Sequence, residues 1–269
     1  MPKGMYVTIM ESLFFEKYSS GMDSVEFTRN DIVEHAVRAG FARPKNLGDL
    51  VYSFRYRTPL PESIKRTAPD GYSWVIIGTG DAKYKFVLSK TTNIMPNRAL
   101  RPILVPNNTP EIITMYSLSD EQSLLSMVRY NRILDMFLGV VAYSMQNHLR
   151  TKVDEIGQIE IDELYIAINK AGQHFIIPVQ AKVGNDKIGA VQLYQDIQFC
   201  SKRFPHLICV PIAVHFENDS NSICMFRLAL DDFAVQIIEE KHYRLSDACQ
   251  ITSEYVCRNN TEITPLLLE

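Results

Sequence analysis

The sequence predicts a mixed α/β protein of two units, with a mixed central sheet in the larger, carboxyl-terminal unit. Three observations support this fold class. Helix caps followed by helical apolar spacing occur near the start of the chain, and a strong hairpin pattern followed by a helix and a buried strand occurs in its second half. The 269 residues, 46% of them apolar, are enough to bury a substantial core.

Composition and charge exclude several classes of protein. The net charge is only −3, and the five cysteines have no CxxC spacing, so neither a disulfide framework nor a zinc ribbon is indicated. The longest apolar stretches, 136–142 and 207–214, are too short to cross a bilayer, and the first fifteen residues make a poor signal peptide. We therefore expect a cytoplasmic protein with reduced thiols and no membrane partner.

The first unit, expected over 1–95, begins with two helices and a hairpin. Thr28 is a side-chain cap for a helix that Gly40 ends, and Asn46 caps a second helix that ends before Pro59. Two β-rich runs, 72–77 and 84–88, then flank turn residues. Two short helices followed by a basic hairpin is the layout of a winged helix, whose second helix usually enters the DNA major groove.

Basic residues are concentrated in this unit. Between positions 43 and 90 there are nine Lys and Arg against four Asp and Glu, which is typical equally of a surface that faces a polyanion and of a solvated basic surface. The residues expected to contact DNA are Arg43, Lys45, Arg55, Arg57, Lys83 and Lys85.

A proline-rich segment, 96–118, is predicted to link this unit to a second one over 119–269. Helical spacing extends over 119–149, and 150–156 is expected to be a short strand. The runs 157–168 and 173–182 are β-rich and flank turn residues, so they predict a hairpin. A helix over 188–204 and a buried strand over 207–214 follow, and 233–238 is interpreted as a helix at a subunit contact.

Polar residues on the predicted hairpin have no role in a core. Glu160 and Asp162 share one face of the first strand, and Gln180 and Lys182 share one face of the second. If Asn169 to Gln173 form the loop, Asp162 lies opposite Gln180 and Glu160 opposite Lys182. A loop one residue shorter turns the two pairs to opposite faces, and the sequence leaves both registers open.

Such a cluster suits phosphodiester hydrolysis. Carboxylate and carbonyl oxygens are hard ligands that Mg²⁺ prefers, and a neighbouring lysine stabilises the hydroxide or the negative transition state. The alternative is a surface ion pair of Lys182 with the acidic strand, which contributes little energy.

Asp162, followed by Gln180-Ala181-Lys182 on the neighbouring strand, resembles the D...(E/Q)xK signature of the PD-(D/E)XK, or restriction endonuclease-like, nucleases. The predicted element order is similar to the αβββαβ core of that superfamily. The resemblance implies that Asp162 is the central metal ligand, that Gln180 and the carbonyl of Ala181 are further ligands, and that Lys182 is the catalytic lysine. It also implies a Mg²⁺ cofactor, which Mn²⁺ can replace, and no nucleotide cofactor.

Two departures from the motif affect the expected metal site. Gln180 replaces the usual carboxylate and Ile161 replaces the usual proline. Glu160 is the first candidate for the missing acid, in both metal binding and catalysis, and Asp135 or Glu121 on the preceding helix are others. On the following helix, Gln192, Gln195 and Asp196 form a polar side, interpreted either as accessory groups that touch phosphate or orient Lys182, or as an ordinary solvent face.

The leading hypothesis is a homodimeric type II-like restriction enzyme that cuts duplex DNA. Cutting both strands usually takes two active sites, which favours a two-fold dimer. Two alternatives stay open: a non-catalytic DNA-binding protein with a degenerate nuclease fold, and a nuclease that acts on repair structures such as branched DNA.

Overall fold

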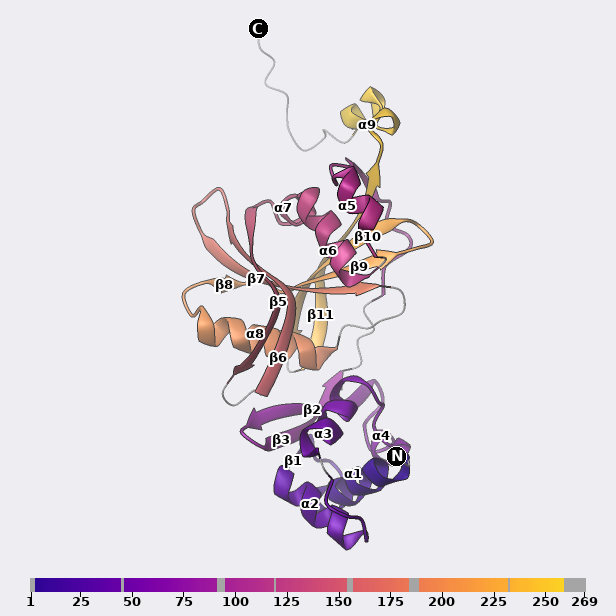
Figure 1. The fold of residues 1–269 in the computed structure, drawn as a ribbon, viewed down its shortest axis with the longest axis vertical. Helices are drawn as coiled ribbons and strands as arrows, with labels where there is room; N and C mark the ends of the chain where they lie inside the picture. Colours follow the sequence, from indigo (N-terminus) through magenta and orange to yellow (C-terminus); the bar gives the residue numbers. More distant parts are fainter. Residues whose placement is uncertain are drawn as a thin grey trace.

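The computed structural model describes residues 3–44, 46–90, 95–118, 120–153, 157–183, 189–231 and 233–258. Two units lie end to end along the long axis (Figure 1). None of the helices in these ranges is long and apolar enough to cross a membrane.

The amino-terminal unit packs helices against a small antiparallel sheet of order β1-β3-β2. Its elements are α1 (Lys3–Lys17), β1 (Ser24–Thr28), α2 (Arg29–Arg38), α3 (Leu47–Tyr56), α4 (Glu62–Lys65), β2 (Tyr72–Gly80) and β3 (Lys83–Lys90). Aromatic residues fill the core, with the Phe14 ring edge-on to Trp74 and Phe86 at 5.2 and 5.1 Å. The helix α1 was not predicted, although its buried residues Ile9 and Leu13 stand at helical spacing.

The caps predicted for α2 and α3 are confirmed. Thr28 Oγ1 accepts from the backbone N–H of Asp31 at 3.2 Å, and the Asp31 carboxylate accepts from the N–H of Thr28 at 2.7 Å, which forms a capping box. Asn46 Oδ1 accepts from the N–H of Asp49 at 3.1 Å. The predicted hairpin is also present as β2 and β3.

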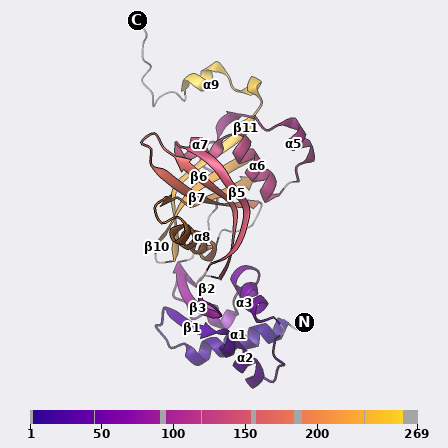
Figure 2. The ribbon, with the colours of Figure 1, turned by 60° about the vertical axis from the view of Figure 1, so that its left-hand side comes forward.

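The second unit is built on a mixed sheet of order β4-β11-β10-β9-β7-β6-β5, with β8 beside β7. The sheet is curled, and the helices lie over it (Figure 2). Its strands are β4 (Ile103–Pro106), β5 (Val141–Val153), β6 (Gly157–Ile168), β7 (His174–Val183), β8 (Ile208–Cys209), β9 (Ile212–Glu217), β10 (Ser222–Asp231) and β11 (Ala234–Ser246). Its helices are α5 (Glu111–Tyr116), α6 (Glu121–Tyr130), α7 (Ile133–Leu138), α8 (Ala190–Arg203), α9 (Ser253–Arg258) and the 3₁₀ turn Ala248–Gln250.

Alternate side chains of the central strands face different helices. Ile177 and Val179 of β7 pack in the cluster that contains α6 and α7, whereas Ile176 packs with Phe199 of α8. Because neighbouring side chains on a strand point to opposite faces, α6 and α7 cover one face of the sheet and α8 covers the other. The strand β7, the helix α8 and the strand β9 form a crossover between parallel neighbours.

The predicted helix over 119–149 is correct only as far as Leu138. Arg132 and Gly139 have left-handed φ values of 54° and 65°. Arg132 lies at the start of α7 and separates it from α6, and Gly139 ends α7. The chain then forms the edge strand β5, so the predicted strand 150–156 begins earlier, at Val141, and 154–156 lie outside the described residues. The apolar spacing was misleading because only Ala142 and Leu149 of β5 are buried.

Three other predicted elements differ. The segment 233–238 is not a helix, because β11 covers it from Ala234 and pairs with β10. The strand expected over 207–214 is divided into β8 and β9 at Pro211, which has no N–H to donate. The segment 96–118 is more than a linker, because β4 pairs in parallel with β11 and α5 follows it.

Candidate active site

The structure decides between the two registers that the sequence left open for the central hairpin. Ile168 pairs with His174, and the pairing continues to Glu163 and Val179. Counting one step further places Asp162 level with Gln180. The longer loop, 169–173, is therefore the one used.

The two strands separate immediately beyond this point. Regular backbone pairing ends at Glu163 and Val179. Beyond them, side chains of one strand bond to backbone groups of the other. Asp162 Oδ2 accepts from the N–H of Ala181 at 2.9 Å, and Gln180 Nε2 donates to the carbonyl of Glu160 at 3.1 Å. The candidate site lies at this opening between β6 and β7.

Lys182 lies beside Asp162 at the opening. Its ammonium donates to Glu121 Oε1 at 2.7 Å and to the carbonyl of Ala181 at 2.8 Å, and it lies 4.0 Å from Asp162 Oδ2. Glu121 is the first residue of α6, so the helix before the sheet supplies an acid to the site. Three groups distant in sequence thus meet at one end of the hairpin.

Gln180 is held by the helix α8 behind it. Its Nε2 donates to Asp196 Oδ2 at 2.8 Å, and its Oε1 accepts from Gln192 Nε2 at 2.6 Å. Gln195 and Asp196 are only 3% and 1% exposed. The polar side of α8 is therefore buried against the sheet, and its interpretation as a solvent face is wrong.

Asp196 is the most unusual carboxyl in this network. One of its oxygens, Oδ1, is buried and has no hydrogen-bond partner in the described structure. Burial raises its pKa well above the usual range, the Gln180 amide lowers it, and the charge of Asp162 raises it. Burial therefore favours the uncharged form of Asp196 more than in an exposed aspartate.

Asp162 is also perturbed, by a different balance of causes. Burial raises its pKa, the N–H of Ala181 and the Lys182 ammonium lower it, and the charges of Glu121 and Glu160 raise it. The net shift is upward, so the protein leaves the Asp162 carboxylate incompletely compensated. A bound cation would supply that compensation.

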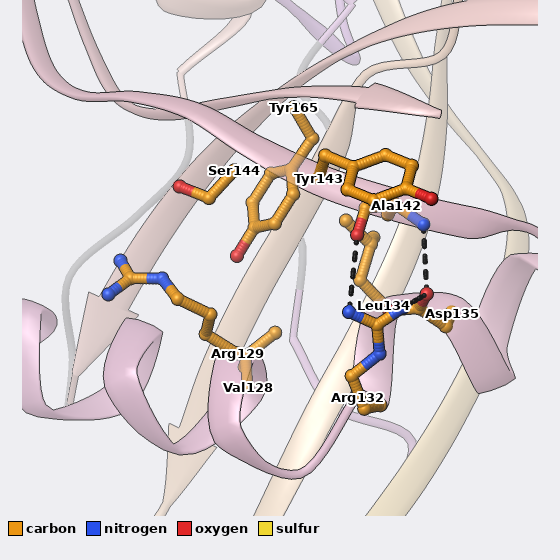
Figure 3. Close-up of a pocket in the computed structure, with 9 residues that line it drawn as sticks. All are labelled: Val128, Arg129, Arg132, Leu134, Asp135, Ala142, Tyr143, Ser144 and Tyr165. Atoms are coloured by element: carbon orange, nitrogen blue, oxygen red, sulfur yellow. Dashed lines mark hydrogen bonds and ion pairs between the residues drawn. The ribbon is translucent and has the colours of Figure 1, made fainter. Parts of the chain in front are cut away.

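Two predicted acids lie elsewhere. The Glu160 carboxylate accepts from Arg150 at 2.7 and 2.9 Å because β5 pairs these residues directly, and Glu160 lines the groove beside the amino-terminal unit. Asp135 accepts from the N–H of Ala142 at 2.8 Å and pairs with Arg132. It lines a separate pocket of about 260 Å³, in which the Tyr165 hydroxyl points between Arg129 and Arg132 (Figure 3).

The oxygens at the opening suit a hard divalent cation in type and number. Asp162, Glu121 and the Ala181 carbonyl offer carboxylate and carbonyl donors, and Mg²⁺ commonly takes one or two carboxylates and keeps several waters. Gln180 is a weaker candidate, because its amide oxygen already accepts from Gln192. Within the described ranges, no three His, Cys, Asp or Glu side chains gather as a metal cluster.

The six residues expected to contact DNA are spread over the first unit. Arg55 and Arg57 line a groove between the two units, but Arg55 Nη2 is buried and Arg55 Nε donates to the carbonyl of Ile76. Arg43 and Lys83 are exposed and Lys85 is half-buried, outside the groove lining, and Lys45 lies outside the described residues.

The sequence interpretation missed the groove residues of the second unit. Arg150 and Lys152 line it from β5. The signal that could have found them is the alternation of basic side chains in 148–152, which the misplaced end of the helix obscured.

Comparisons with family models, with curated proteins and with solved structures found no match.

Proposed function

We propose that this protein is a metal-dependent DNA endonuclease that hydrolyses phosphodiester bonds. The observation that carries the proposal is the meeting of Asp162, Glu121 and Lys182 where β6 and β7 separate. Hard oxygen donors beside a positioned ammonium are the groups that such hydrolysis needs.

The order of elements around the site supports the same proposal. From α6 to β9 the chain forms two helices, three antiparallel strands, a crossover helix and the two short strands β8 and β9, both parallel to β7. Apart from the extra helix and the divided last strand, this is the order of the αβββαβ core that the motif resembles. In the first unit, a helix, a strand, two helices, the short helix α4 and a two-stranded hairpin follow one another, an order similar to that of a winged helix. The two layouts together favour a DNA-binding unit joined to a nuclease unit.

Each residue has a distinct part in this mechanism. Asp162, Glu121 and the Ala181 carbonyl would hold Mg²⁺, which when bound lowers the pKa of a water and offsets phosphate charge. Lys182, fixed by Glu121 and the Ala181 carbonyl, would stabilise the negative charge that develops on the phosphate. The buried Gln180 amide fixes the distance between β6 and α8.

A plasmid nicking assay with Mg²⁺ tests the proposal. The parent protein should nick supercoiled DNA, and Asp162→Ala and Lys182→Ala should each lose about 10²-fold or more of the rate. The matched controls are the exposed residues Asp23→Asn and Lys170→Ala, which should nick at the parental rate. Equal nicking by Asp162→Ala and the parent would overturn the proposal.

One observation favours a second candidate function, a non-catalytic DNA-binding protein. Gln180 stands where the motif usually has a carboxylate, and burial raises the pKa of Asp196, the acid to which Gln180 is bonded, well above its usual range. This alternative predicts salt-sensitive DNA binding with neither nicking nor metal uptake.

A further inference from the structure

A groove of about 1120 Å³ lies between the two units. One wall is the exposed face of α3, and the other is the end of the β5–β6 hairpin nearest the amino-terminal unit (Figures 1 and 2). Glu160, in the second wall, is two residues from Asp162 along β6, a distance of about 7 Å for a strand. A ligand in the groove therefore lies close to the candidate active site.

Positive charge exceeds negative charge in the groove lining. Its basic residues are Arg29, Arg55, Arg57, Arg150 and Lys152, and its acidic residues are Asp49, Asp81 and Glu160. Arg150 pairs with Glu160 at 2.7 Å and Lys152 with Asp81 at 3.5 Å. Arg29 and Arg57 are exposed and have no carboxylate partner among the described residues, which leaves them available to a polyanion, whereas Arg55 is half-buried and bonded to the Ile76 carbonyl.

Two tyrosines of α3 form an aromatic platform in the same groove. The Tyr52 and Tyr56 rings lie 4.8 Å apart and are 39% and 40% exposed. The Arg57 guanidinium lies 4.8 Å from the Tyr52 ring centre, and that of Arg55 lies 5.1 Å from the Tyr56 ring centre. Aromatic rings that alternate with arginines are the surface on which unpaired bases stack.

The groove is too closed for a duplex to be read by α3. An α-helix about 10–12 Å across fills a major groove about 12 Å wide, so the two phosphate walls of the duplex must pass on either side of the helix. Here the Tyr56 hydroxyl donates to Gln195 Oε1 of α8 at 2.6 Å, and Ser89 donates to the carbonyl of Phe233 at 2.6 Å. The second unit occupies the space that one wall of the duplex would need.

We propose that this groove binds a single strand of DNA, with bases stacked on Tyr52 and Tyr56 and phosphates beside Arg29 and Arg57. The inference rests on the proposed nuclease function and narrows its substrate to DNA with an unpaired strand. The strand passes Glu160 and reaches Asp162 and Lys182. Among the hypotheses from the sequence, this favours the nuclease of repair structures over the restriction enzyme.

Fluorescence anisotropy tests the inference without relying on cleavage. Labelled oligothymidine and a labelled duplex, each about ten nucleotides long, are titrated with the full chain in EDTA. The parent should bind the single strand more tightly, and Tyr52→Ala and Tyr56→Ala should each weaken that binding about 5- to 100-fold. Tyr56→Phe keeps the ring and should recover most of the binding that Tyr56→Ala loses. The matched control is Tyr72→Ala, which removes an exposed tyrosine outside the groove and should bind as the parent does.

Tighter binding of the duplex, or single-strand binding that neither alanine variant weakens, would overturn the inference while leaving plasmid nicking intact. Tyrosine-dependent single-strand binding by a protein that nicks nothing would instead support the groove assignment and overturn the nuclease proposal. The two failures are thus distinguishable.

Discussion

Two neighbouring residues of β6, Asp162 and Glu163, each face a basic side chain, but their environments differ. Glu163 is fully buried, and its Oε1 accepts from Arg129 at 2.8 and 2.9 Å and from Ser144 at 2.5 Å. Asp162 has its ammonium partner at 4.0 Å, and Lys182 is bonded to Glu121 instead. Glu163 belongs to a close structural ion pair, whereas Asp162 belongs to a site with unmatched negative charge.

The pKa shifts express the same difference. Burial lowers the pKa of Arg129, but Glu163 and Tyr165 together raise it more, so the guanidinium is stabilised in its charged form. Burial raises the pKa of Asp162, and its partners do not reverse that shift. A buried carboxylate next to a cation is therefore a candidate for function when the cation is shared, and a structural element when it is not.

Exchanging each carboxylate for its amide gives the largest expected contrast in stability. Glu163→Gln leaves the partly buried Arg129 without its counter-charge and should lower the free energy of unfolding by about 3 kcal/mol. Asp162→Asn removes a charge that burial disfavours and should leave that free energy unchanged or higher. Urea unfolding at pH 7 measures both variants, and an equal loss in the two would remove the distinction between the sites.

Glu121→Gln tests whether the Glu121 carboxylate positions Lys182. Because a neutral amide holds the ammonium less firmly, the nicking rate should fall about tenfold, roughly 1.4 kcal/mol in activation free energy. Glu111→Gln, an exposed change in the first turn of α5, is the matched control and should nick at the parental rate. A parental rate for Glu121→Gln would show that Lys182 acts without Glu121.

Asp196→Asn sharpens the comparison through pH. The folded-state pKa of Asp196 is raised, so its stabilising contribution is complete at low pH and is lost as pH rises through that pKa. The amide keeps an oxygen for Gln180 and cannot ionise. The variant should therefore gain stability relative to the parent as pH rises from the ordinary aspartate pKa to the raised folded-state pKa, by about 1.4 kcal/mol for each pH unit in that interval and by no more above it.

Urea unfolding of the parent and of Asp196→Asn at pH 5, 7 and 8.5 measures this difference. If the free energy of unfolding of the variant instead falls relative to that of the parent as pH rises, the pKa of Asp196 is not raised in the folded protein.

Tyr56→Phe has the smallest expected effect. It removes one hydroxyl bond between the units, which is worth about 1 kcal/mol, and keeps the aromatic ring. Thermal unfolding followed by calorimetry should show a slightly lower midpoint with unchanged cooperativity. Two separated transitions would show that this bond holds the two units together.

Local chemistry made part of the structure predictable from the sequence. Thr28 and Asn46 cap helices with their own side chains, and the predicted hairpin is present as β6 and β7. These features depend on residues within a few positions of one another. The register that places Asp162 level with Gln180 was one of two that the sequence allowed, and only the folded hairpin decides between them.

Other features depend on packing between distant segments. The chain from Val141 has the apolar spacing of a helix, but pairing with β6 makes it an edge strand. Arg150 on that strand pairs with Glu160, so the acid expected beside Lys182 is bonded to Arg150 instead. The closeness of α3 to α8 through Tyr56 and Gln195 likewise arises only in the folded protein.

Isothermal titration calorimetry with Mn²⁺ tests most directly whether the opening between β6 and β7 holds a divalent ion. We expect the parent and Lys170→Ala to bind one ion per chain and Asp162→Asn to bind none at that site. No uptake by the parent, or the same uptake by Asp162→Asn, would contradict the assignment of a metal-dependent site.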